Sequence, residues 1–160
     1  MSLADVSSIL WRERELLDLL LFKLEEEQVL LASGRTRWLA RATREVEVVL
    51  DEVRRTEVVR AAEVDEAARS LGLGPSPSLR TLADAAGEPW STLLHEHREA
   101  FLTTTAEISA LADANRTMLA TGARAAREAL LSLGDAPTTY TPDGSRASSG
   151  TYHRLVDEAF

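Results

Sequence analysis

The sequence predicts an all-α fold: an elongated antiparallel helical hairpin plus a third long helix in a coiled-coil-like bundle, a short linker helix and a mobile C-terminal tail. Leu, Ala, Arg and Glu dominate, and only 5% of the 160 residues are aromatic. Such side chains lose little rotamer freedom in a helix. Apolar residues also recur at three- and four-residue steps over three long segments, as on one face of a helix. We predict one helical-bundle domain over residues 1–133 and a flexible tail over 134–160.

The first predicted helix covers about residues 3–33, which contain no Pro or Gly. Its heptad has Leu at every first position from Leu3 onward, whereas the second seam position holds Glu13 and Glu27. We expect each glutamate to face an arginine of a neighbouring helix or solvent, because a buried carboxylate without a partner is costly. Gly34 then marks the end of this helix, since Gly commonly follows a helix terminus.

A second helix is expected over about residues 36–71, with an apolar stripe that begins at Trp38. Two long helices joined by a tight turn must lie antiparallel, so residues 3–71 should form a helical hairpin. Four arginines without an intervening acid open this helix: Arg35, Arg37, Arg41 and Arg44. We interpret them as ion-pair partners of Glu25, Glu26 and Glu27 across the hairpin, and a phosphate-binding patch is the alternative.

Residues 72–77 contain two Gly and two Pro and are expected to form a linker, because neither residue type continues a helix. Ser78 can cap a short helix that ends near Ala86. A third long helix should run from about residue 90 to 133, with one seam formed by Leu94, Phe101, Ile108, Leu111, Asn115 and Met118. A second apolar face follows, and Gly122 interrupts it. Residues 135–150 lack apolar periodicity and are expected to be mobile.

Charge and composition exclude several classes of function. The chain has 26 acidic and 18 basic residues, a net charge of −8, which disfavours nucleic acid as a partner because phosphate binding needs a cationic surface. It has no cysteine, which excludes a disulfide framework and thiol catalysis. We find no apolar run of the roughly 20 residues that a bilayer span needs. We therefore expect a cytoplasmic protein that does not insert into membranes.

No residue pattern indicates catalysis, so we expect no enzyme activity, no catalytic residues, no metal and no cofactor. His95 and His97 are two residues apart and point to different faces of a helix, which does not suit a shared metal ion. We interpret His97 as a hydrogen-bonded core residue. Three tryptophans near helix ends are interpreted as core anchors: Trp11, Trp38 and Trp90. A single Asn on a helix seam, Asn115, commonly sets register and partner choice.

Several segments, taken in order, resemble the FlgN family of flagellar export chaperones. The first helix has Leu16-Leu17 and Leu20-Leu21-x-x-Leu24-x-x-Glu27-x-x-Leu30-Leu31. The second helix carries Arg60, ends at Leu71-Gly72 and precedes a Pro-containing linker. The third has Asn115-Arg116-x-x-Leu119 and then Leu130-Leu131-x-Leu133-Gly134, and the tail has Tyr140-x-x-x-Gly144. The resemblance covers about residues 10–144.

This resemblance implies a chaperone without enzyme activity that binds hook-associated flagellar proteins, the subunits of the hook-filament junction. It implies that the chaperone prevents premature assembly and delivers these subunits to a component of the flagellar export gate. The implied partner-binding residues are Asn115, Leu119, Ala123, Ala126, Leu130 and Leu133. The implied residue for export-gate docking is Tyr140.

Two other interpretations stay open on the residues alone. One is a structural coiled-coil scaffold or interaction module without a chaperone role, and a homodimer is a further assembly that the heptads permit. The other is a helical-bundle enzyme with a metal ion, which the histidine spacing disfavours.

Overall fold

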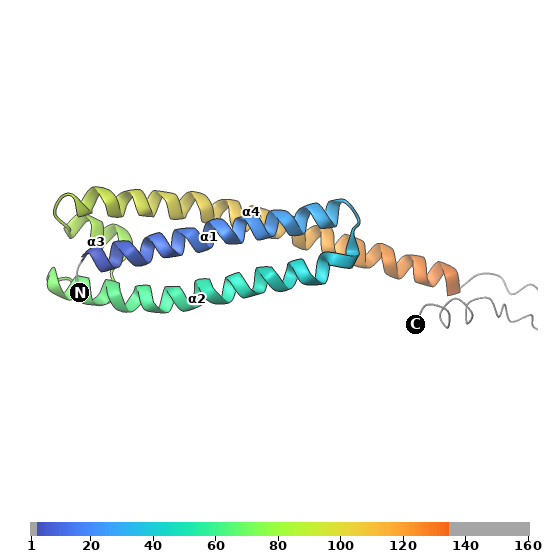
Figure 1. The fold of residues 1–160 in the computed structure, drawn as a ribbon, viewed down its shortest axis with the longest axis horizontal. Helices are drawn as coiled ribbons and strands as arrows, with labels where there is room; N and C mark the ends of the chain where they lie inside the picture. Colours follow the sequence, from blue (N-terminus) through green and yellow to red (C-terminus); the bar gives the residue numbers. More distant parts are fainter. Residues whose placement is uncertain (1–2, 135–160) are drawn as a thin grey trace, which may run out of the picture. The chain divides into compact units, whose positions relative to one another are not determined.

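The regular elements of the protein are all helices, in a computed structural model that describes residues 3–134 (Figure 1). Helix α1 spans Leu3–Ala32 and helix α2 spans Leu39–Ser70, and a short 3-10 helix, η1, covers Thr36–Trp38 between them. Helix α3 spans Leu79–Ala85 and helix α4 spans Trp90–Gly134. The prediction of an all-α fold with two hairpin helices, a short helix and a third long helix is confirmed.

The chain divides into two compact units after Ala120, a point that lies within α4. The first unit contains α1, α2, α3 and the beginning of α4. In the second unit the described residues, 121–134, are entirely α-helical. The domain boundaries expected from the sequence, 1–133 and 134–160, stay a prediction because residues 135–160 lie outside the described part.

The turn between α1 and α2 requires a backbone conformation that glycine adopts without strain. Gly34 has a φ angle of 67°, and the backbone N–H of Arg35 donates to the carbonyl oxygen of Leu30 at 3.1 Å. This arrangement satisfies a carbonyl that the end of the helix would otherwise leave unpaired. The turn is so short that α2 runs antiparallel to α1, as predicted (Figure 1).

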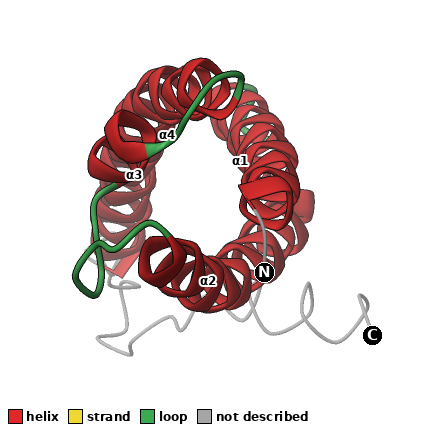
Figure 2. Ribbon diagram, turned by 90° about the vertical axis from the view of Figure 1, so that its left-hand side faces the viewer, coloured by secondary structure: helices red, strands yellow, loops and turns green. Residues whose placement is uncertain are grey.

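Two apolar clusters form the core of residues 1–120. At the end where α3 lies, Leu82 and Ala83 of α3 are buried together with residues of the three long helices: Val6, Leu10, Ala67, Ala68 and Leu94. The short helix α3, which lies beside α4 (Figure 2), is capped as predicted, because the Ser78 hydroxyl accepts a 3.0 Å hydrogen bond from the Thr81 N–H.

The second cluster extends along the hairpin. Its buried members are Leu16, Leu17, Leu20 and Leu24 of α1 with Val46, Val49 and Val53 of α2. Side chains of the predicted α4 seam pack against them: Phe101, Ile108 and Leu111. The predicted packing of the hairpin against the third long helix is therefore confirmed for this seam.

Candidate partner-binding surface

The final part of α4 presents apolar side chains to solvent. Ala123 and Ala126 are exposed, and the side chains of Leu130 and Leu133 have exposed fractions of 70% and 60%. These four residues alternate at steps of three and four and therefore lie on one face of the helix. We call them the α4 face. An apolar heptad face usually lies against another helix, so this exposed one is a candidate surface for a partner.

The two predicted binding residues that precede the α4 face are less accessible. Leu119 is half-buried, and Asn115 is only 3% exposed. The Asn115 Nδ2 atom donates a hydrogen bond to the carbonyl oxygen of Leu24 in α1, at 2.9 Å. Asn115 therefore holds α4 to α1 within the bundle. A direct contact of Asn115 with a partner protein stays a prediction.

The predicted residue for export-gate docking, Tyr140, lies outside the described residues. Its role stays a prediction, as do the roles of the α4 face.

The two seam glutamates of α1 are both buried, and the prediction of their partners was right for one. The Glu13 carboxylate lies 3.1 Å from the Arg60 guanidinium of α2, as predicted. Burial raises the pKa of Glu13, the Arg60 charge opposes that shift, and Glu57 adds to it. Glu27 instead accepts a 3.3 Å hydrogen bond from the hydroxyl of Thr43. Glu27 is 5% exposed, so both alternatives expected for it, an arginine partner and solvent, were wrong.

His97 is a core histidine, as predicted. It is fully buried, with its Nε2 atom 3.4 Å from the Ser7 hydroxyl and its Nδ1 atom 3.5 Å from the Arg14 guanidinium. The Trp11 ring meets it edge-on, and Phe101 stacks on it. Burial, with a smaller contribution from the Arg14 charge, lowers the pKa of His97 to about 4. The imidazole is therefore neutral at pH 7.

The other described histidine is not close to a metal-ligand set. His95 Nε2 lies 3.0 Å from the carboxylate of Asp84, which follows α3's core-facing residues. Among residues 3–134, no group of three or more His, Cys, Asp and Glu side chains is placed to hold a metal ion. The third histidine, His153, lies outside the described part of the chain.

A family model decides the class of protein. The model of the family described as FlgN protein matches residues 1–148. The chain belongs to the FlgN family. FlgN proteins are flagellar export chaperones rather than enzymes, which gives this chain its general role. No curated protein and no solved structure matches this FlgN-family chain. Within the part that the structure describes, no helix has both the length and the apolarity to cross a bilayer.

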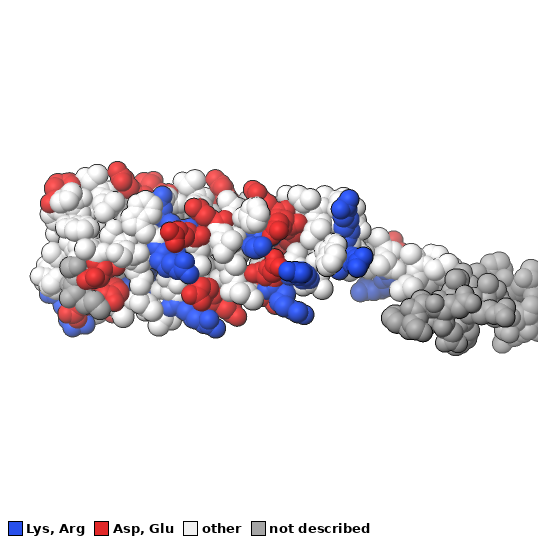
Figure 3. Space-filling view, in the orientation of Figure 1, with Lys and Arg blue, Asp and Glu red and all other residues white. Residues whose placement is uncertain are grey.

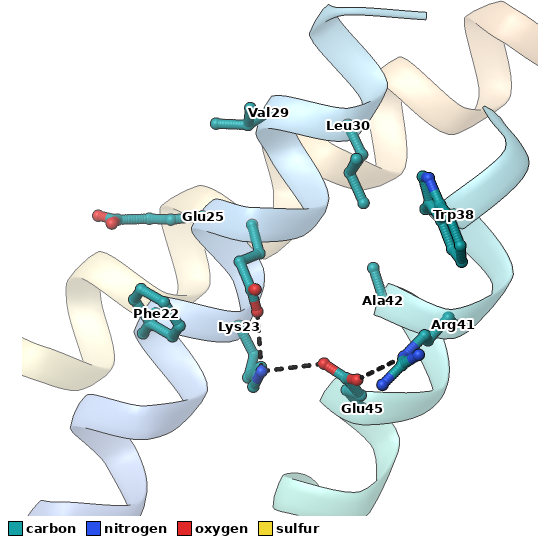
Figure 4. Close-up of a pocket in the computed structure, with 10 residues that line it drawn as sticks. Phe22, Lys23, Glu25, Val29, Leu30, Trp38, Arg41, Ala42 and Glu45 are labelled. Atoms are coloured by element: carbon teal, nitrogen blue, oxygen red, sulfur yellow. Dashed lines mark hydrogen bonds and ion pairs between the residues drawn. The ribbon is translucent and has the colours of Figure 1, made fainter. Parts of the chain in front are cut away.

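The arginines at the hairpin tip of this FlgN-family chain do not pair as expected. Among the described residues, none of the four makes an ion pair with Glu25, Glu26 or Glu27. Lys23 instead contacts Glu26 and Glu45 at 2.9 Å each, and Arg41 contacts Glu45 at 3.1 Å (Figure 4). The cross-hairpin pair therefore runs from a lysine of α1 to a glutamate of α2, and the four arginine side chains are exposed.

Two of the three tryptophans are not core anchors, which corrects the sequence prediction. Trp11 and Trp38 are each 48% exposed, and only Trp90 is partly buried against the first apolar cluster. Trp38 belongs to the 3-10 helix before α2, so its direction does not follow the α-helical phase of the later stripe. Phe22 and Val29 of α1, which stand outside the heptad seam, are exposed near it. Sequence reasoning missed this tip, although apolar residues outside the seam could have indicated it.

Proposed function

We propose that this FlgN-family chain is a cytoplasmic chaperone that binds hook-associated flagellar proteins, prevents their premature assembly and delivers them to the export gate. The observation that supports the binding step is the α4 face, an apolar heptad face exposed at the end of a long helix. Junction subunits that expose coiled-coil seams before assembly would associate with one another. A chaperone that covers such a seam with a complementary helix suppresses that association.

The two halves of the α4 face suit different parts of such a contact. Ala123 and Ala126 are small and let a partner helix approach closely, whereas Leu130 and Leu133 offer large apolar side chains. Full burial of a leucine side chain contributes roughly 1.5–3 kcal/mol. Most of the binding free energy at this face should therefore come from the two leucines.

A matched pair of variants tests this proposal. We expect Leu130→Asp/Leu133→Asp to weaken binding to a purified hook-associated protein at least about tenfold in calorimetric titration, because charges would enter an apolar contact. Leu131→Asp is the control. Leu131 is 64% exposed on the same helix, yet it points about 100° away from Leu130 around the helix axis. Unchanged affinity in the double variant, or equal weakening in the control, contradicts the proposal.

The delivery step is proposed to use the tail. Tyr140 would dock to a component of the export gate while the α4 face holds the junction protein. Tyrosine suits such a contact because it offers apolar area and a hydroxyl at low entropic cost. The net charge of −8 supports protein partners over nucleic acid.

A structural coiled-coil scaffold is the second candidate, because the same exposed heptad face suits self-association. The mass in solution, with and without a hook-associated protein, distinguishes the two. A scaffold keeps its homo-oligomeric mass when the junction protein is added. A chaperone forms a small complex, and a homodimer built on the α4 face dissociates as that complex forms.

A further inference from the structure

The tip of the α1–α2 hairpin has an apolar groove on its surface. The groove has a volume of about 660 Å³, and the residues that line it include Phe22, Val29 and Leu30 of α1 and Trp38 of η1 (Figure 4). The side chains of Phe22, Val29 and Trp38 have exposed fractions of 55%, 65% and 48%. We call this surface the tip groove. Its residues differ from those of the α4 face, so the two surfaces can be changed separately by mutation.

A run of arginines adjoins the α2 side of the tip groove, although the whole chain is acidic. Residues 35–44 contain four arginines and no acid in a chain of net charge −8. All four arginine side chains are exposed, and Lys and Arg atoms gather around this turn (Figure 3). The Arg37 guanidinium lies 4.9 Å from the centre of the Trp38 ring, so charge and apolar surface adjoin.

Acids near the groove do not cancel this charge. Glu26 and Glu45 are both held by Lys23, and Glu45 also pairs with Arg41. Arg35, Arg37 and Arg44 make no ion pair with another described residue. Glu25, which is exposed, lines the groove from α1, on the side opposite the arginines. The cations that line the tip groove, Lys23 and Arg41, are thus paired, and a cation without an ion-pair partner adjoins it at Arg37, which stacks on Trp38.

We propose that the tip groove is a second docking surface, which binds an acidic amphipathic helix of a partner protein. A groove between two helices has no free backbone donors for an added strand, whereas it accepts the apolar stripe of a third helix. Phe22 and Val29 are seven residues apart, which is two helical turns or about 10.5 Å. The acids of the bound helix lie along the flank that faces Trp38 and Arg37, because Arg37 adjoins the groove there without an ion-pair partner.

Two designed peptides of about 20 residues serve as probes, with three helical turns of leucine at steps of three and four. One carries glutamates along one flank, and the other carries lysines at the same positions. Each is labelled with fluorescein and titrated with the full chain while anisotropy is measured. We expect the glutamate peptide to bind at least about tenfold more tightly than the lysine peptide, and its affinity to fall as salt rises.

Substitutions in the full chain locate the bound peptide. We expect Trp38→Ala and Arg37→Glu/Arg44→Glu each to weaken binding of the glutamate peptide about tenfold or more. Val58→Ala and Arg54→Glu are the controls on α2, since Val58 is 72% exposed and Arg54 is an exposed partner of Asp51. Both should stay within about twofold of the unsubstituted protein. Circular dichroism checks folding, and Trp38→Phe replaces Trp38→Ala should the latter unfold.

Several results overturn the proposal. The first is that the glutamate peptide does not bind. The second is that both peptides bind with equal affinity. The third is that the control substitutions weaken peptide binding as much as Trp38→Ala and Arg37→Glu/Arg44→Glu do. Loss of peptide binding in Leu130→Asp/Leu133→Asp assigns the peptide to the α4 face instead. If sedimentation shows a dimer and Trp38→Ala dissociates it, the groove binds a second copy of this chain rather than a partner's helix. If a chain that ends at Gly134 binds the peptide much more tightly than the full chain, residues 135–160 compete for the groove and are its occupant. The α4 proposal is unaffected by the first three results, because its own test uses a hook-associated protein.

Discussion

The side-chain amide of Asn115 in α4 donates a 2.9 Å hydrogen bond to the backbone carbonyl oxygen of Leu24 in α1. A helical carbonyl has two lone pairs, so Leu24 can accept this bond in addition to its own intrahelical one. The Asn115 Oδ1 atom is buried without a hydrogen-bond partner among the described residues. Sliding α4 along the hairpin would leave the whole buried amide without a hydrogen-bond partner, which is costly. The bond therefore sets the register of α4 against α1.

Asn115→Ala is expected to lower the free energy of unfolding by about 1–2 kcal/mol, because one buried hydrogen bond and its packing are lost. Urea denaturation followed by circular dichroism measures the change. The same variant also tests the predicted contact with a partner. Lost binding to a hook-associated protein at unchanged stability would mean that Asn115 contacts the partner rather than α1.

Leu20→Asp is expected to unfold the bundle at physiological temperature. Leu20 is 3% exposed and belongs to the second apolar cluster, so the variant buries a carboxylate without a partner. Such a change costs about 3–5 kcal/mol, a large part of the stability of a small domain. Leu19→Asp is the control, because Leu19 is 42% exposed. If thermal melts give Leu20→Asp the same melting temperature as this control, the assignment of Leu20 to the buried seam is wrong.

Stability should fall in mild acid because of His97. Its pKa is about 4 in the folded protein against an ordinary value of 6.5, so folding favours the neutral ring. This contribution is complete above about pH 6.5 and is lost as the pH falls from there toward 4. Between about pH 7.5 and pH 4, we expect the protein to lose up to about 3 kcal/mol more stability than His97→Phe loses. Parallel pH dependences of the two proteins in urea titrations would contradict this.

Residues 119–133 should exchange amide hydrogens faster than the hairpin, because their exposed face gains little from burial. Gly122→Ala should slow exchange locally, since the added methyl meets nothing within 4 Å and Ala favours a helix by about 1 kcal/mol. Adding a hook-associated protein should raise protection further. Equal protection of this segment in the free and bound states would argue that no partner covers the α4 face.

Tyr140→Ala is expected to weaken docking to the export-gate component while leaving binding of a hook-associated protein nearly unchanged. Paired pull-downs against the two partners test this, with Tyr152→Ala, the other tyrosine of the chain, as the control. Lost junction-protein binding at unchanged gate binding would reverse the assignment. A melting temperature several degrees lower would mean that Tyr140 packs against the folded protein.

The helices themselves were predictable from the sequence because helix formation depends on neighbours in the chain. The heptad leucines, the Ser78 cap and Gly34 placed the helices within a few residues of their observed bounds. The arginine partner of Glu13 was also predictable, because a nearby cation offsets part of the cost of burying a carboxylate.

The partners and exposure of residues around the candidate sites could not be predicted from the sequence, because they depend on how the helices face one another. Glu27 meets Thr43 rather than an arginine, and Trp38 is exposed at the tip rather than anchored in the core. A sequence pattern gives the period of a helix, but the turn and the packing set its rotation against a neighbour.

By itself, the sequence determined that this chain forms amphipathic helices in a hairpin with a third long helix, and its family resemblance is confirmed by the family match. Only the tertiary structure decided which apolar residues the bundle covers. It buries Leu94, packs Phe101, Ile108 and Leu111 against the core, and leaves Leu130 and Leu133 exposed, although both segments have the same heptad spacing. The physical reason is that periodicity records only a helix's own apolar face, whereas burial also requires a second surface in contact with it.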